Sequence, residues 1–255
     1  MTQSKNSRLP IDVTKLVAHR GLRSKYPENT ILAIRKAVEA GASFVELDVQ
    51  FSKDKLPIIY HDTSLKRVSG SSKSVFECNL ADLLKESAYE PDRLGNQFID
   101  ETIAALDNLV EILKANPLVI AFVEVKQESI PHCGRQHILD TIETTLSSVA
   151  DQVVIMSFDY TISLMARQDH WPLIGVVLKA WDDLDSKSVL EIKADFVFVD
   201  HKTIPLDIDI TSIEALRNST LVAYEVSSSQ LGYQLLERGV DLLETFELER
   251  LMSQD

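Results

Sequence analysis

Short apolar segments that recur along the chain constrain its fold more than any other feature. Eight of them are rich in Val, Ile and Phe, at 16–18, 44–48, 119–125, 153–157, 173–178, 196–200, 221–226 and 241–244. Most are continuous rather than alternating with polar residues, which is typical of parallel strands buried on both faces. The pattern therefore predicts a mostly parallel β-sheet covered by helices.

Segments with a helical period separate these strands. They lie at 29–40, 102–115, 136–149, 160–167, 186–193, 211–218 and 229–238. The first has Thr30 or Asn29 as a candidate N-cap and Gly41 directly after it, where glycine commonly ends a helix. Eight strands alternating with helices over 255 residues predict an α/β chain folded as a (β/α)8 TIM barrel. No G-x-G-x-x-G motif follows the first strand, so a dinucleotide-binding sheet is disfavoured.

One interval breaks the alternation of strands and helices. Residues 62–100 contain no strong strand and no long helix, and the stretch SGSSKS at 69–74 is turn-like. We expect a single domain spanning 1–255, with a small insertion at about 62–100 after the second strand.

Composition limits the partners of the chain. Its 26 Lys and Arg against 39 Asp and Glu give a net charge of −13, which argues against binding nucleic acid or anionic lipid. There is no apolar run long enough to span a membrane, and the first ten residues lack the apolar core of a signal peptide. Cys78 and Cys133 are far apart, so neither a disulfide framework nor a thiolate metal site is indicated. We expect a cytoplasmic protein that acts on a small molecule, and the sequence makes no prediction of its oligomeric state.

Polar residues stand at or just beyond the carboxyl ends of the first three predicted strands, where TIM barrels hold their active sites. They are His19, Arg20, Glu46, Asp48, His61, Glu124 and Lys126. Glu46 and Asp48 are two residues apart on one strand, so their side chains point to the same side. Three carboxylates without a thiolate suit a hard divalent cation, Mg²⁺, Ca²⁺ or Mn²⁺, better than zinc.

The remaining four polar residues supply acid/base and cationic groups. Histidine is the usual acid/base side chain near neutral pH, so of His19 and His61 one can take a proton from a nucleophile while the other gives one to a leaving group. Arg20 and Lys126 can hold an anionic group. A metal, two acid/base groups and two cations together point to the cleavage of a phosphate ester.

The same residues lie in motifs that resemble the glycerophosphodiester phosphodiesterase family. The motifs are AHRG at 18–21, PENT at 27–30, VELDV at 45–49, HD at 61–62 and VEVK at 123–126, and the likeness extends from residue 16 to residue 245. The resemblance implies a TIM barrel with an insertion after the second strand. It also implies metal-dependent hydrolysis of diesters such as glycerophosphocholine or glycerophosphoethanolamine to glycerol 3-phosphate and an alcohol.

The resemblance further implies a role for each site residue. His19 and His61 match the catalytic pair, Glu46, Asp48 and Glu124 match the metal ligands, and Arg20 and Lys126 match the phosphate contacts. The chain departs from the family at 224–227, where it has Tyr-Glu-Val-Ser in place of a Trp-Thr-Val-Asn type of stretch, and after residue 245.

Several roles and two other functions stay open from the sequence. Tyr224 either lines a substrate pocket or packs in the barrel, and Asp62 either orients His61 or shapes a turn. Glu28 and Asn29 are interpreted as scaffolding at the start of the first helix, with Asn29 as its cap. A lysophospholipase D type of enzyme would need an apolar groove, which Val75, Phe76, Leu80, Leu83 and Leu84 of the insertion could line. The other alternative is a catalytically inactive, metabolite-binding barrel.

Overall fold

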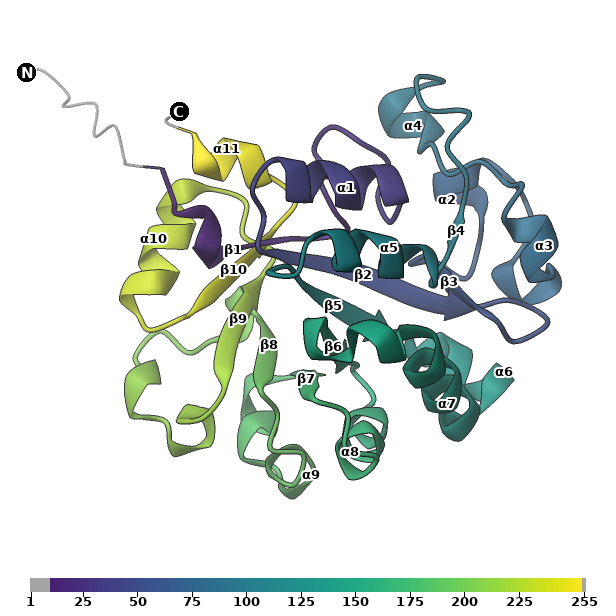
Figure 1. Ribbon diagram of the computed structural model, residues 1–255. Helices are drawn as coiled ribbons and strands as arrows, with labels where there is room; N and C mark the ends of the chain where they lie inside the picture. Colours follow the sequence, from purple (N-terminus) through teal and green to yellow (C-terminus); the bar gives the residue numbers. More distant parts are fainter. Residues whose placement is uncertain (1–9, 254–255) are drawn as a thin grey trace, which may run out of the picture.

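Eight parallel strands close into a barrel in the computed structural model, which describes residues 10–253. In chain order they are β1 (Leu16–Ala18), β2 (Phe44–Phe51), β5 (Ile120–Val125), β6 (Val153–Met156), β7 (Leu173–Val177), β8 (Phe196–Asp200), β9 (Thr220–Tyr224) and β10 (Leu242–Thr245). Each strand pairs with the next, and β1 pairs with both β2 and β10, which closes the ring (Figure 1). The eight strands coincide with the eight apolar segments, so the predicted TIM barrel is confirmed.

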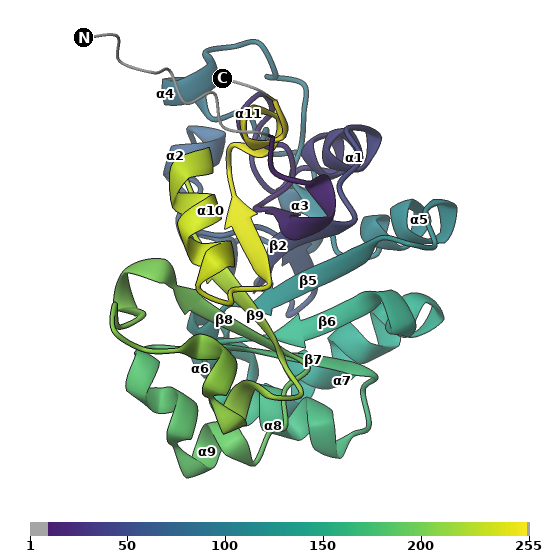
Figure 2. The ribbon, with the colours of Figure 1, turned by 90° about the vertical axis from the view of Figure 1, so that its left-hand side faces the viewer.

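Helices cover the outside of this barrel (Figure 2). The longer ones are α1 (Ile31–Glu39), α5 (Asn108–Ala115), α7 (Arg135–Leu146), α8 (Tyr160–Gln168) and α10 (Ser229–Glu237), and the shorter ones are α6 (Ile130–Cys133), α9 (Lys187–Leu190) and α11 (Leu248–Met252). Their apolar faces and the outward side chains of the strands form the largest hydrophobic cluster of the protein. Burial of this layer supplies the main stabilisation expected of a barrel.

The predictions for two helices were partly wrong. The helix predicted at 102–115 begins only at Asn108, because Ala104–Ala105 form a short strand, β4, that pairs antiparallel with β3 (Pro57–Ile59). The segment 211–218 forms only two 3₁₀ turns, Ile210–Ser212 and Glu214–Leu216. The Asp209 carboxylate accepts both the backbone N–H and the hydroxyl of Thr211, and such local side-chain bonds compete with a regular helix.

The segment between β3 and β4 builds a small subdomain at the right-hand side of Figure 1. It contains α2 (Lys66–Ser69), α3 (Leu80–Leu83) and α4 (Pro91–Leu94). Its buried apolar side chains form a cluster separate from those of the barrel: Ile58, Tyr60, Leu65, Val68, Val75, Cys78, Leu83, Ala88 and Ile103. Val75 and Leu83 are fully buried in it, and Phe76 and Leu80 pack against it. Four of the five side chains considered for an apolar groove are therefore used in packing, whereas the fifth, Leu84, is 37% exposed.

Large apolar side chains fill the interior of the barrel. Phe122 lies between the rings of Phe196 and Phe198, with ring centroids 5.0 and 4.9 Å away, and the residues that complete this inner cluster are Val17, Val154, Met156, Val177, Val222 and Leu242. The interior is thus a packed floor, as in other barrels of this type, and not a pore. A polar site therefore has to lie beyond this floor, at the carboxyl ends of the strands.

No helix within residues 10–253 is long and apolar enough to cross a membrane. Cys78 and Cys133 are both free and buried. The signal-peptide prediction concerns the first ten residues, of which 1–9 lie outside the described part of the chain.

Candidate active site

The strand alternation that fills the barrel floor also places a polar layer above it. On β2 the inward positions continue from Phe44 to Glu46 and Asp48, because inward residues recur at every second position. By the same alternation Phe122 of β5 is followed by Glu124. The register places Asp48 directly opposite Glu124 on the neighbouring strand. The predicted carboxylates are therefore brought together at one end of the barrel.

These carboxylates form a cluster that could hold a metal ion. One oxygen from each of Glu46, Asp48 and Glu124 lies within 4.8 Å of the others, and Glu46 also forms a second such group with His19 and Glu244. Oε1 of Glu46 and Oε1 of Glu244 are buried without a hydrogen-bond partner among the described residues. A buried, unpartnered carboxylate oxygen is costly, and a hard divalent cation would satisfy it. The donor set therefore fits the predicted Mg²⁺, Ca²⁺ or Mn²⁺.

Burial and mutual repulsion set the charges of the cluster. Burial, followed by the nearby charges of Asp48 and Glu244, raises the pKa of Glu46 well above its ordinary value. Burial and Glu124 do the same to the pKa of Glu244. Asp48 differs, because Arg20 and Lys126 outweigh its burial and hold the pKa of its carboxyl below the usual range. A bound cation would favour the charged forms of Glu46 and Glu244 as well.

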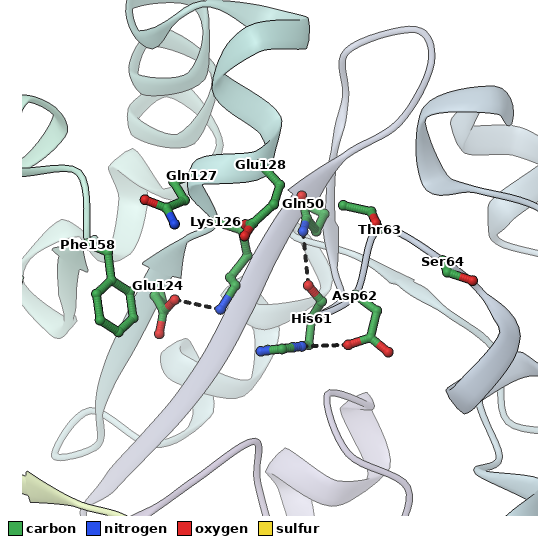
Figure 3. Close-up of a pocket in the computed structure, with 10 residues that line it drawn as sticks. All are labelled: Gln50, His61, Asp62, Thr63, Ser64, Glu124, Lys126, Gln127, Glu128 and Phe158. Carbon is green, nitrogen blue, oxygen red and sulfur yellow. Dashed lines mark hydrogen bonds and ion pairs between the residues drawn. The ribbon is translucent and has the colours of Figure 1, made fainter. Parts of the chain in front are cut away.

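The two cationic side chains predicted for the site, Arg20 and Lys126, lie against the carboxylates. Nε of Arg20 is 3.0 Å from Oδ2 of Asp48, and the Arg20 backbone N–H donates to Oε2 of Glu46 at 3.0 Å. Nζ of Lys126 lies 2.7 Å from Glu124 and 3.2 Å from Asp48. Neighbouring carboxylates raise the pKa of Lys126 despite its burial, so it stays charged over the physiological range. Glu124, Lys126 and Phe158 line a pocket of about 470 Å³ (Figure 3).

His19 lies at one side of the cluster, immediately after β1. Its ring stacks on Phe246, with centroids 4.2 Å apart and planes 7° apart, and its Nε2 is 3.6 Å from Oε2 of Glu46. Burial, with help from the charge of Arg20, lowers the pKa of His19 well below its ordinary value. The ring is therefore neutral at physiological pH and can exchange a proton with a bound substrate.

His61 lies at the other side, just after β3. Its backbone carbonyl accepts a hydrogen bond from Gln50 at 2.9 Å, and its Nδ1 is 2.6 Å from Oδ1 of Asp62. Figure 3 shows the second ring nitrogen pointing into the pocket on the side of Glu124. The interpretation that Asp62 orients His61 is thus supported by direct contact.

A cavity of about 170 Å³ connects the two histidines. It is lined by His19, Arg20, His61, Glu124, Lys126, Met156, Phe158, Val177, Phe198, Tyr224, Glu225 and Glu244. Tyr224, the last residue of β9, therefore belongs to the wall of the site, and burial raises the pKa of its hydroxyl. A group of about the size of a phosphate and its substituents can reach both histidines from this cavity.

Two features of the site were missed or misread in the sequence. Glu244 was not singled out, although it stands two positions beyond the inward Leu242 and so has the same alternation as Glu46. Asn29 does not cap α1, because the Thr30 hydroxyl accepts the Ala33 N–H instead. Asn29 has a positive φ of 56°. Its amide donates to Oδ2 of Asp48 at 2.7 Å and accepts the Asp48 N–H at 3.0 Å.

Comparisons with known proteins agree with this geometry. The family model of the glycerophosphoryl diester phosphodiesterase family matches residues 19–245. A glycerophosphodiester phosphodiesterase of Bacillus altitudinis is 30% identical over 156 residues, covering 58% of this chain and 59% of the relative. Glycerophosphodiester phosphodiesterase 1 of Mus musculus is 36% identical over 118 residues, which cover 46% of this chain and 35% of the relative. The matches thus span less than two thirds of these relatives.

The solved structure of an Oleispira antarctica phosphodiesterase, described in complex with the product sn-glycerol-3-phosphate, has the same fold. It superposes with a TM-score of 0.80 over 93% of this chain and 94% of that one, at 22% identity. The fold, the strand-end cluster and the match over residues 19–245 converge. The chain belongs to the glycerophosphoryl diester phosphodiesterase family.

Proposed function

We propose that this protein hydrolyses glycerophosphodiesters to glycerol 3-phosphate and an alcohol in a reaction that requires a divalent cation. The observation that carries the proposal is the pair His19 and His61, which share one cavity with a cluster of buried carboxylates. The relatives' names and the product in the Oleispira antarctica structure support the same substrate class. Glycerophosphocholine and glycerophosphoethanolamine are the substrates we expect.

The chain's own residues account for the proton transfers. One histidine takes the proton of the glycerol 2-hydroxyl, whose oxygen bonds to phosphorus, while the other gives a proton to the alcohol oxygen as its bond to phosphorus breaks. Water then opens the resulting cyclic phosphate, with the two histidines in exchanged roles. Lys126 and Arg20 lie where they can meet the negative charge of the phosphate.

Glu46, Asp48 and Glu124 would hold the cation, Mg²⁺, Ca²⁺ or Mn²⁺. When bound, it would polarise a phosphoryl oxygen and lower the pKa of the attacking hydroxyl. Asn29 binds both the carboxylate and the backbone N–H of Asp48. These two hydrogen bonds would keep the carboxylate in place for this role.

The test is the release of glycerol 3-phosphate from a panel of diesters with added Mg²⁺, Ca²⁺ or Mn²⁺, with and without EDTA. We expect release that EDTA abolishes and that His19→Ala or His61→Ala reduces at least 100-fold. No release from any diester, or release unchanged by His19→Ala, would overturn the proposal. Lysophosphatidylcholine in the same panel tests the lipid alternative, and binding of a diester without turnover would favour the inactive barrel.

The wider predictions are part of the same proposal. We treat residues 62–100 as an insertion in a single barrel domain, and we expect a small diester rather than nucleic acid as the partner. The cytoplasmic location inferred from the composition stays a prediction.

A further inference from the structure

Asp62 is held between His61 and an arginine that the sequence analysis did not consider. Its Oδ1 lies 2.6 Å from Nδ1 of His61. Arg67 donates from Nε to Oδ2 at 2.8 Å and from Nη2 to Oδ1 at 3.0 Å. Both oxygens of Asp62 are therefore engaged by a bidentate guanidinium, which fixes the plane of the carboxylate.

These contacts determine which nitrogen of His61 carries the proton. Burial works to raise the pKa of Asp62, but hydrogen bonds from His61 and Arg67 outweigh it and hold this pKa below the usual range. An ionised carboxylate only accepts hydrogen bonds, so Nδ1 of a neutral His61 has to be the protonated nitrogen. Nε2 then faces the pocket as the acceptor.

The same guanidinium is anchored on a second, deeply buried carboxylate. Arg67 donates from Nη1 and Nη2 to the two oxygens of Glu28 at 2.8 and 2.7 Å. Glu28 is only 1% exposed and also accepts from Arg20 at 2.9 Å and from Arg23 at 2.8 Å. Burial works to raise the pKa of Glu28, but Arg67 and Arg20 lower it to about 2.

A continuous series of contacts thus joins the two sides of the active site. It runs from His61 through Asp62, Arg67 and Glu28 to Arg20, which lies 3.0 Å from Asp48. Arg67 belongs to α2. The segment between β3 and β4 therefore supplies a side chain that holds residues of the candidate active site in place.

We propose that Arg67 is a positioning residue: by clamping Asp62 against Glu28 it fixes the ring orientation and the tautomer of His61. This inference rests on the proposed function of His61, but its structural part can be measured without turnover. Arg67 itself contacts neither the carboxylate cluster nor the cavity between the histidines in the described contacts. It acts through Asp62.

The backbone around Arg67 is secured independently of its side chain. Val68 and Ser69 are buried, the Val68 carbonyl accepts the N–H groups of Tyr89 and Glu90, and the Ser69 hydroxyl lies 3.4 Å from the Tyr60 hydroxyl. The Arg67 side chain is 41% exposed, and Glu28 keeps its hydrogen bonds from Arg20 and Arg23 when the guanidinium is removed, so we expect the fold to be kept. Arg67→Met preserves the apolar stem but not the guanidinium, and Arg67→Lys preserves the charge but not the bidentate geometry.

Arg167→Met is the matched control. Arg167 lies in the last turn of α8, is 29% exposed and pairs at 2.6 Å with Asp195, just before β8. This pair lies at the amino-terminal end of the strands, opposite the site, so its loss affects stability alone. Asp62→Asn is the second test variant, because it removes the negative charge and one of the two acceptor oxygens while keeping the shape.

Two measurements decide the proposal. In ¹⁵N NMR of ring-labelled protein, with His61→Asn to assign the signals and at a pH where the ring is neutral, the parent protein should show the single Nδ1–H tautomer. Arg67→Met should shift both nitrogen signals toward a mixture of tautomers, and Arg67→Lys should shift them less. With the best diester, Arg67→Met should lose about 10- to 100-fold in kcat with KM changed less than about 3-fold.

The outcomes separate this inference from the proposed function. A parent protein without diesterase activity would refute the proposed function, while the NMR signals would still test the clamp. An unchanged tautomer in Arg67→Met and Asp62→Asn, or a kcat equal to that of Arg167→Met, would overturn the inference. A kcat loss without any change in the His61 signals would also overturn it, because the effect would then not pass through His61.

Discussion

Glu46→Gln should abolish the gain in stability that a divalent cation gives to the parent protein. Glu46 is fully buried, and its Oε1 has no hydrogen-bond partner among the described residues. Glutamine has the same shape, so its oxygen can still accept the Arg20 N–H that now reaches Oε2 at 3.0 Å. The substitution replaces a carboxyl group that can ionise by a neutral amide and leaves the packing in place.

Without a cation, the variant should be the more stable protein near neutral pH. The folded state raises the pKa of Glu46, through burial first and through Asp48 and Glu244 next, so folding keeps a proton that the unfolded chain releases. The stability of the parent therefore falls as pH rises above the ordinary pKa of 4.5. The loss amounts to about 1.4 kcal/mol for each pH unit up to the raised pKa. Glutamine does not titrate and escapes this loss.

The cation should increase the stability of the parent protein but not that of the variant. At a cation concentration about 100 times Kd, binding stabilises the folded state by about 2.7 kcal/mol, which raises the Tm of a chain of this length by about 5–11 °C. Thermal unfolding followed by circular dichroism, with EDTA or with Mg²⁺, Ca²⁺ or Mn²⁺, measures both effects.

Glu143→Gln provides the matched control for the opening prediction. Glu143 lies on α7, outside the barrel, with an unpartnered Oε1 and a pKa raised by burial. The cation should raise the Tm of this variant as much as it raises the Tm of the parent protein. If Glu46→Gln also keeps the full cation-induced gain, Glu46 is not a ligand and the assignment of the cluster is refuted.

Three further predictions follow from the same geometry. Gly21 has φ +77° and a Cβ there would lie 2.6 Å from the backbone of α1, whereas Gly41 has φ +100° and open space. Gly21→Ala should therefore cost about 3 kcal/mol in urea unfolding and Gly41→Ala about 1 kcal/mol, and equal costs would contradict the clash. Phe246→Ala removes the stack on His19 and should lower kcat/KM about 2- to 12-fold. Because burial is the main cause of the lowered pKa of His19, the limb of the pH profile that belongs to His19 should move to higher pH, and a profile with unmoved limbs would refute this. Lys126→Met should lower kcat/KM about 10-fold or more through the loss of a charge-assisted phosphate contact, and steady-state kinetics showing less than a 2-fold change would exclude that contact.

The sequence was sufficient to predict the barrel and the grouping of Glu46, Asp48 and Glu124 at one end of it, because both depend on local periodicity. An apolar segment such as 119–125 specifies a buried strand, and its alternation places Glu124 on the inward face, above Phe122. The same rule would have found Glu244. It was overlooked because no motif of the family drew attention to it.

Other features depend on contacts between distant segments, which periodicity does not encode. The helical pattern of 102–115 cannot show that residues 104–105 pair with β3. Nothing near Asn29 in the chain shows that its amide meets Asp48, 19 residues away, and Arg67 reaches Glu28 across 39 residues. Tertiary partners decide such roles, so local propensity gives only a weak prior for them.

In the proposed function an acidic chain has to accept an anionic substrate, and the distribution of charge in the site would allow this. Asp48 is compensated on both sides by Arg20 and Lys126, and its pKa is lowered accordingly. Among the described residues, neither Glu46 nor Glu244 forms an ion pair with a lysine or arginine side chain, and burial and neighbouring carboxylates raise their pKa values. The unmet need for positive charge therefore lies beside Glu46, where a divalent cation would bring two charges at once. In the proposed function, with that need met, Lys126 would be left to face the phosphate, and the net charge of −13 would affect encounter at long range rather than binding in the cavity.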